Sequence, residues 1–399
     1  MQLRSIPQKV SARLAPYRAS FKCKQAQHFN IWCWLLVSLL LAGSGRLKEL
    51  TRWMPQRLAY WTVLRFVKAK VWDEQALLDL MVDDLLATLP PPRDGVLNLI
   101  FDTTRTAKTG KQQPLAYTTK TGKFEPYVFG HTVLLLVAQW GQFRVPLAVR
   151  VLNPNIKGHQ NILVRELLTQ YVPPVWCQRV VVEADAGFAA KATLQHIAAL
   201  SYFYVFALPR TWKTADGRHL RDIARHTNKR CYHRIASYQP DGRRRDYWTV
   251  REAIKLTALG DVTLVLSKRR FNDPPRHIKL LVTNLSGAST GTILSYYARR
   301  WAVEVIFKEL KSGLHLGQMQ VTRGAHSPQP RAASHGVCVV TAVVRVGVTT
   351  GPKRQPVGLA APLPRRGVSR AVRPQRGALQ KEAGATQAAM KPSAADFCQ

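Results

Sequence analysis

Long apolar-rich segments, broken by glycine and proline, dominate the first part of the chain. This pattern predicts a small helical domain over residues 26–92 that ends at Pro90-Pro91-Pro92. Its apolar segments are Ile31–Ala42, Leu58–Val71 and Ala76–Leu89. Two neighbouring segments rich in Arg and Lys, Leu47–Trp53 and Gln56–Lys68, fit either a helix-turn-helix or an ordinary helical bundle.

Short β-type runs separated by helical patterns follow the prolines. Residues Trp140-Gly141-Gln142 separate two of the runs and have the composition of a hairpin turn. The predicted strands are Val96–Phe101, Thr132–Ala138, Phe143–Leu152, Arg179–Ala184 and Tyr202–Leu208, with helices over Asn161–Tyr171 and Phe188–Leu200. This order, three strands and then helix, strand, helix, strand, predicts a mixed α/β sheet.

Residues 209–286 change in composition and interrupt this pattern. They hold 18 Lys and Arg against 7 Asp and Glu, with predicted strands at Val262–Leu266 and Ile278–Val282. We interpret them as a basic, β-rich insertion. A long helical pattern returns from Thr292 to about Leu316.

The last residues, 323–399, form a tail of different composition. They carry 12 Lys and Arg, 2 acidic residues, 8 Gly and 8 Pro, and Phe397 is their only aromatic residue. Such a segment buries too little apolar area to offset its ordering entropy, so the composition predicts disorder. The text resembles an out-of-frame translation of a GC-rich gene.

The charge of the whole chain points to polyanionic partners. The formal net charge is +36 while 46% of the residues are hydrophobic, so the chain is basic and still able to fold. Nucleic acid is the first partner class and an anionic membrane surface the second. The longest apolar run is too short to span a bilayer, so no membrane protein is indicated. Six scattered cysteines, with no C-x-x-C, favour a reducing cytoplasm.

The first 48 residues contain no Asp or Glu. This composition resembles an organellar transit peptide as well as a DNA-binding arm. We favour a basic arm over residues 1–25, because the basic excess continues through the whole chain.

Two aspartates lie where an α/β sheet presents ligands. Asp102 stands at the end of the first predicted strand, and Asp185 follows the run Val180–Val182. Turn or cap roles are the ordinary alternative for each aspartate. Glu183 competes with Asp185, since it is two residues away on the same strand face.

A third carboxylate lies on the predicted helix that begins near Thr292. Five of its polar residues fall within an arc of about 80° at ~100° per residue. They are Tyr297, Arg300, Glu304, Lys308 and Lys311. A solvated charged face is the ordinary explanation, but the apolar neighbours Trp301, Val305, Ile306 and Phe307 favour partial burial.

The spacing Tyr297-x2-Arg300-x3-Glu304-x6-Lys311 resembles the Tyr-Arg-Glu-Lys signature of DDE transposases of bacterial insertion sequences. The segments around Asp102 and Asp185 look like the first and second carboxylate boxes of that family. The resemblance covers roughly residues 95–320. It implies an RNase H-like catalytic core with a β-rich insertion, and a helical N-terminal domain that helps to bind transposon ends.

The resemblance also implies roles for these residues. Asp102, Asp185 and Glu304 would be the catalytic residues and would hold two Mg²⁺ ions, with Mn²⁺ able to substitute. Tyr297, Arg300, Lys308 and Lys311 would contact DNA phosphates. The chemistry would be in-line displacement at phosphorus, first by water and then by a freed 3′-hydroxyl.

Several other residues have open interpretations. Trp248, beside Arg243, Arg244 and Arg245, could stack on an unpaired base, with the arginines on DNA, or could be a buried strand tryptophan. His131 and His159 fit either an approach to DNA or ordinary core and turn positions. The basic glycine-containing loops after Asp102 do not complete a P-loop, so an ATP site is not expected.

The sequence as a whole predicts an insertion-sequence transposase. We expect it to act on double-stranded DNA as a homodimer, in a bacterial cytoplasm and associated with the nucleoid. The predicted divisions are 1–25, a basic arm; 26–92, a helical DNA-binding domain; 93–322, the catalytic domain; and 323–399, the aberrant tail. The alternative is a truncated or frameshifted, catalytically inactive remnant that only binds DNA.

Overall fold

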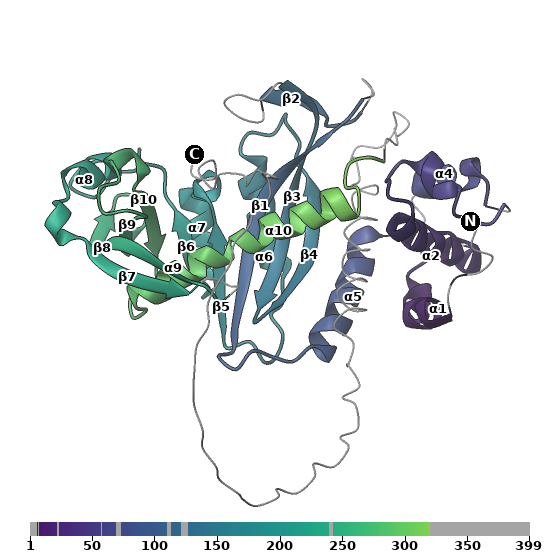
Figure 1. Cartoon of the computed structure of the whole chain (residues 1–399), viewed down its shortest axis with the longest axis horizontal. Helices are drawn as coiled ribbons and strands as arrows, with labels where there is room; N and C mark the ends of the chain where they lie inside the picture. The colour runs from purple at the N-terminus through teal and green to yellow at the C-terminus, as the bar shows by residue number, and fades with distance from the viewer. Residues whose placement is uncertain are drawn as a thin grey trace, which may run out of the picture. The chain divides into compact units, whose positions relative to one another are not determined.

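The structure is a computed structural model that describes most of the chain before residue 320 (Figure 1). The described residues are 6, 8–21, 24–56, 58–68, 73–109, 113–120, 127–238 and 242–319. The predicted tail at 323–399 lies outside them, as do residues 1–5 of the predicted basic arm.

The N-terminal part of the described chain is helical. Its elements are α1 (Gln8–Leu14), η1 (Ala15–Ser20), α2 (Gln25–Leu41), α3 (Leu47–Thr51), α4 (Tyr60–Lys68) and α5 (Glu74–Thr88). Asp73 caps α5 by accepting hydrogen bonds from the backbone amides of Gln75 and Ala76. Residues 52–59 separate α3 from α4, and a helix-turn-helix uses a turn of only three or four residues. The structure therefore favours the ordinary helical bundle.

Aromatic side chains form much of the helical core. Trp32 and Trp34 of α2 are fully buried, and so are Leu14 and Phe21 from the segment predicted as a basic arm. Tyr17 of that segment donates a hydrogen bond from its hydroxyl to Asp84 Oδ2 at 3.0 Å. Residues 8–21 thus pack within the bundle. Of the helices in the described residues, none has the length and apolarity needed to cross a bilayer.

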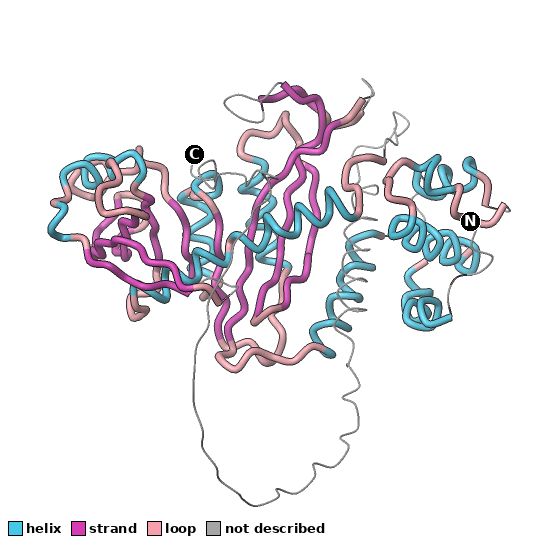
Figure 2. The backbone as a smooth tube through the Cα atoms, viewed as in Figure 1, coloured by secondary structure: helices cyan, strands magenta, loops and turns pink. Residues whose placement is uncertain are grey.

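The ten strands of the described residues form one sheet (Figure 2). They are β1 (Val96–Ala107), β2 (Tyr117–Lys120), β3 (Tyr127–Trp140), β4 (Phe143–Val151), β5 (Arg179–Ala184), β6 (Phe203–Ala207), β7 (His233–Tyr238), β8 (Arg244–Leu256), β9 (Gly260–Lys268) and β10 (Lys279–Thr283). β3 pairs with β1 and β4 antiparallel, whereas β1, β5 and β6 pair in parallel. The predicted mixed α/β sheet is confirmed.

The strands of the predicted insertion continue the same sheet. β10 pairs antiparallel with β6, and β9, β8 and β7 follow in that order. The sequence predicted only β9 and β10. β7 lies against the helix α9 (Thr290–Arg299), and Ser237 Oγ is 3.2 Å from Ser295 Oγ across that contact. The insertion is therefore joined to the helix that leads to Arg300.

Helices cover both faces of the sheet. α6 (His159–Gln170) and α7 (Lys191–Ala199) pack with Val180, Val182 and Ala184 of β5. Val181, which points to the opposite face, packs with Ile293 and Leu294 of α9. α10 (Trp301–Lys308) contacts β1 and β3, as Figure 1 shows. The remaining short helices are η2 (Ala186–Phe188), α8 (Leu220–His226), η3 (Lys229–Cys231), η4 (Pro275–His277) and η5 (Glu309–Gly313).

The segment that follows η5 is fastened to β1. The buried Lys108 Nζ donates to the carbonyl oxygens of Gly317 at 3.1 Å and Met319 at 3.0 Å. Gly317 has φ +91°, and a Cβ there would lie 2.6 Å from Thr106 Cβ. Only glycine fits this position, because both the left-handed backbone and the close approach exclude a side chain.

We expect Gly317→Val to destabilise the protein by about 3 kcal/mol, measured by chemical unfolding. Gly242→Ala is the matched control. Gly242 also has a positive φ, +78°, but nothing lies within 4 Å of its added Cβ. The control should cost only about 1 kcal/mol. Equal losses in the two variants would contradict the packing argument.

Candidate active site

Three carboxylates reach one region from separate elements. Asp102 lies in β1, Asp185 caps η2 directly after β5, and Glu304 lies in α10. The backbone amide of Thr103 donates to Asp102 Oδ1 at 2.7 Å, and that of Gly187 donates to Asp185 Oδ1 at 2.9 Å. These bonds fix one oxygen of each aspartate.

Arg300 bridges two of the carboxylates. Its Nη1 lies 3.3 Å from Asp102 Oδ2 and its Nη2 lies 2.5 Å from Glu304 Oε1. The side chains of Asp102 and Arg300 are each only 18% exposed. A charge-assisted bridge in so sheltered a place is stronger than one on the open surface.

Burial raises the pKa of Asp102 to about 6. Arg300 and the Thr103 amide oppose this shift, while the negative charges of Asp185 and Glu304 add to it. All three carboxylates therefore interact electrostatically. A cation placed among them would favour the ionised forms.

Glu183 has a different environment from Asp185. Its side chain is 0% exposed and neither carboxylate oxygen has a hydrogen-bond partner among the described residues. Burial raises its pKa well above 4.5, against a weaker opposing effect of Arg299 and Arg300. Asp185 keeps partial exposure. Of these two competitors, solvent reaches only Asp185.

The helix of the predicted signature is not continuous. It breaks at Arg300 between α9 and α10, and η5 is a π-helical turn in which Leu314 N donates to Glu309 O at 3.1 Å. The single 80° face assumed from regular helical geometry is therefore wrong, because the break and the wider turn change the angle between residues. Lys308 and Lys311 are both exposed.

Tyr297 and Trp301 flank Arg300 differently from expectation. Tyr297 is half-buried, with Lys279 Nζ 4.9 Å and Arg300 Cζ 6.0 Å from its ring centroid. Trp301 is 55% exposed, so the partial burial inferred for it was wrong. An exposed tryptophan beside Arg300 is a functional candidate that the sequence reasoning missed. Its signal was a large aromatic residue at a helix start next to the signature arginine.

The comparisons with known proteins follow from this geometry. Residues 98–327 match the family model described as transposase DDE domain. The chain belongs to this family. No curated protein sequence matches it.

A solved structure titled "Cryo-EM structure of piggyBac transposase synaptic complex with hairpin DNA (SNHP)" is similar to this DDE transposase domain chain, with 10% sequence identity and a TM-score of 0.44. The match covers 82% of this chain and 66% of the other, so this chain spans a little under two thirds of that protein's length. The sheet and the helices around it agree with a DDE transposase fold.

Domains of this family use divalent metal ions. Among the described residues, no three His, Cys, Asp or Glu side chains are gathered closely enough to hold a metal as they stand. The donor chemistry nevertheless fits, because carboxylate oxygens are the ligands that Mg²⁺ prefers. The guanidinium of Arg300 contacts two of the three carboxylates.

The predicted stacking tryptophan lies in the extended sheet. Trp248, in β8, is half-buried with its ring centroid 4.7 Å from that of Phe271, which agrees with the packing alternative for this residue. Arg243, Arg244 and Arg245 are exposed, and Arg244 Nε lies 3.2 Å from Asp246 Oδ1. No distance brings this group to the three carboxylates.

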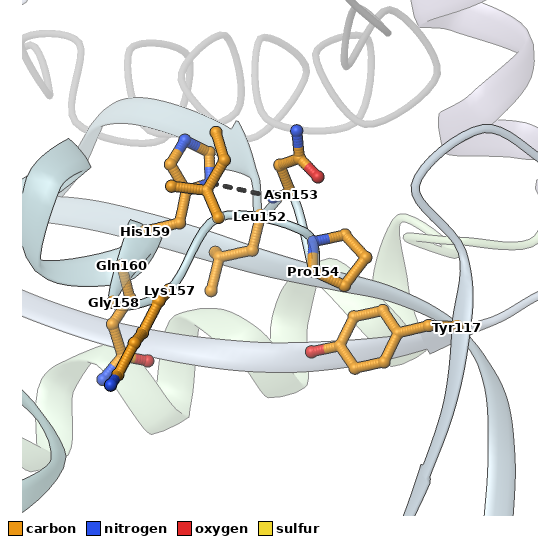
Figure 3. A pocket seen from close by; sticks show the side chains of 9 residues that line it. Tyr117, Leu152, Asn153, Pro154, Lys157, Gly158, His159 and Gln160 are labelled. Atoms are coloured by element: carbon orange, nitrogen blue, oxygen red, sulfur yellow. Dashed lines mark hydrogen bonds between the residues drawn. The ribbon is translucent and has the colours of Figure 1, made fainter.

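The two histidines have structural roles. His159 Nδ1 accepts a hydrogen bond from the Asn153 amide at 2.8 Å, as the dashed line in Figure 3 shows. His131 Nε2 donates to the carbonyl oxygen of Pro114 at 2.8 Å. Burial, with a contribution from Lys108, lowers the pKa of His131 to about 4.

This lowered pKa predicts an acid-sensitive fold. The unfolded chain binds a proton at His131 near pH 6.5, whereas the folded chain resists until about pH 4. Stability is therefore lost as the pH falls from 6.5 to 4, by about 3 kcal/mol in all. Urea unfolding of the wild type and of His131→Gln across this range checks the prediction. A wild-type loss no larger than that of the variant would contradict it.

Proposed function

We propose that this chain is the transposase of a bacterial insertion sequence, which cleaves transposon ends and joins them to target DNA. The observation that supports this most strongly is the electrostatic coupling of Asp102, Asp185 and Glu304, three carboxylates from separate elements within the family match. We take these three residues to be catalytic. The net charge of +36 suits a DNA partner.

The metal ligands of this proposal are the same three carboxylates, with two Mg²⁺ ions or Mn²⁺ as the cofactors. Two such ions stabilise the attacking and leaving oxygens of an in-line displacement at phosphorus. Arg300 neutralises Asp102 and Glu304 and, with Tyr297, Lys308 and Lys311, would hold phosphates beside the scissile bond.

The remaining parts of the chain would bind and pair DNA. The helical domain at 26–92 would contact transposon ends, with the basic segments of 1–25 as an arm. The insertion at 209–286, with Arg243, Arg244, Arg245 and Trp248, would add contacts to the same DNA. The protein would act as a homodimer when bound to DNA, in the cytoplasm and on the nucleoid, and 93–322 would be its catalytic domain.

The test uses the full chain and DNA that carries the inverted repeats flanking its coding sequence. Binding in EDTA should weaken with salt, with a slope of about −0.9 per phosphate neutralised. Cleavage should require Mg²⁺ or Mn²⁺. Binding that ignores salt would contradict a DNA partner. Salt-dependent binding without metal-dependent cleavage would support the inactive remnant instead.

A further inference from the structure

Two adjoining pockets open beside the strand that carries Asp102. The larger one, of about 670 Å³, is lined by β1, β2 and β3 and by Lys311. The smaller one, of about 390 Å³, is lined by the loop from Asn153 to Gln160 (Figure 3). Tyr117, Leu152 and Gln160 line both pockets. We call these two pockets together the Tyr117 groove.

The lining of the Tyr117 groove is cationic and contains an aromatic ring. Arg105, Lys120 and Lys311 line the larger pocket and Lys157 lines the smaller one, and none of the described lining residues is Asp or Glu. The guanidinium carbon of Arg105 lies 4.2 Å from the Tyr117 ring centroid. Tyr117 Oη and Thr132 Oγ1 are 2.8 Å apart, which holds the ring in place.

The groove is connected to the elements that carry all three carboxylates. Thr103, which lines it, is bonded through its amide to Asp102. Gln160 Nε2 donates to the carbonyl oxygen of Gly187 at 2.7 Å, and Gly187 is the residue whose amide holds Asp185. Lys311 lies in η5, which directly follows the α10 helix of Glu304.

We propose that the Tyr117 groove binds a single DNA strand whose unpaired nucleotides lead to the three carboxylates. Arg105, Lys157 and Lys311 contact its phosphates, and a base stacks on Tyr117. Basic grooves with aromatic rings are the general design of single-strand binding sites. The volumes suit compact ligands of nucleotide size, and a paired base inside a duplex has no free face for stacking. The inference rests on the proposed DNA-cleaving function.

The experiment measures binding of the full-length protein to a single-stranded oligonucleotide of about 8 nucleotides that carries 2-aminopurine, in EDTA. Tyr117→Ala should abolish the quenching of 2-aminopurine fluorescence and weaken binding about tenfold, whereas Tyr117→Phe should keep both within about twofold. Arg105→Ala and Lys157→Ala should each weaken binding and reduce the salt slope by about 0.7.

Arg179→Ala is the matched control. Its guanidinium also lies over an aromatic ring, that of Phe203 at 5.5 Å, but Arg179 starts β5 opposite Val96, at the other end of the β1 strand. This variant should leave quenching and affinity unchanged. Melting temperatures establish that each variant is folded, and the exposed Lys157 and the conservative Tyr117→Phe remain informative if Tyr117→Ala fails to fold.

Three results would overturn the inference. They are wild-type quenching in Tyr117→Ala, an equal loss of duplex binding in the Arg105→Ala and Lys157→Ala variants, and displacement of the strand by a mononucleotide at the strand's own concentration. Glu304→Gln separates this inference from the proposed function. Cleavage that survives Glu304→Gln contradicts the function, whereas normal strand binding by the groove variants contradicts only the groove.

Discussion

Asp102→Asn and Glu304→Gln each lower DNA cleavage by at least about 10³-fold, while DNA binding in EDTA stays within about twofold. Each substitution removes a negatively charged oxygen from the carboxylate cluster but no phosphate contact. Loss of several kcal/mol of transition-state stabilisation gives an effect of this size. Single-turnover cleavage of end DNA with Mg²⁺, beside anisotropy binding in EDTA, measures the two quantities separately.

Glu309→Gln and Glu183→Gln are the matched controls for this prediction. Glu309 is an exposed carboxylate in η5, and Glu183 is a buried one whose raised pKa already favours the neutral form that Gln mimics. Both variants should cleave normally. If Glu183→Gln abolishes cleavage while Asp185→Asn preserves it, the second carboxylate has been assigned to the wrong residue.

Arg300→Ala lowers cleavage by about 10²-fold and also weakens DNA binding. The guanidinium contacts both Asp102 and Glu304, and it is the strongest influence that lowers the pKa of Asp102. Without it the pKa of Asp102 rises above about 6, so the acidic limb of the pH–rate profile moves to higher pH. Pre-steady-state rates measured between pH 5 and pH 9, at about one-unit steps, test the direction of this shift.

Arg300→Lys should not restore the rate, because one ammonium group cannot reproduce the two-pronged contact of a guanidinium. Arg299→Ala is the control: Arg299 is the adjacent residue and lies over the Tyr296 ring at 5.1 Å, away from Asp102 and Glu304 in its printed contacts. A pH profile of Arg300→Ala that coincides with the wild-type profile would contradict the bridging role.

The elements with strong hydrophobic periodicity could be predicted from the sequence. Arg179–Ala184 was predicted as a strand and is β5, and the hairpin at Gly141-Gln142 joins β3 to β4 with Gly141 at φ +50°. β7 and β8 were missed because they alternate apolar with charged residues on an exposed part of the sheet. The position of Asp102 and Asp185 after their apolar runs was also readable.

The sequence by itself determined the order of elements, the basic charge and the signature residues, since local periodicity and spacing depend only on neighbours along the chain. Only the tertiary structure decided that Arg300 bridges Asp102 and Glu304, that Glu183 is sealed from solvent, and that the signature helix breaks. These features depend on contacts between residues far apart in sequence: 198 positions separate Asp102 from Arg300. Burial and electrostatic coupling arise only when the sheet and helices pack, so no local pattern encodes them.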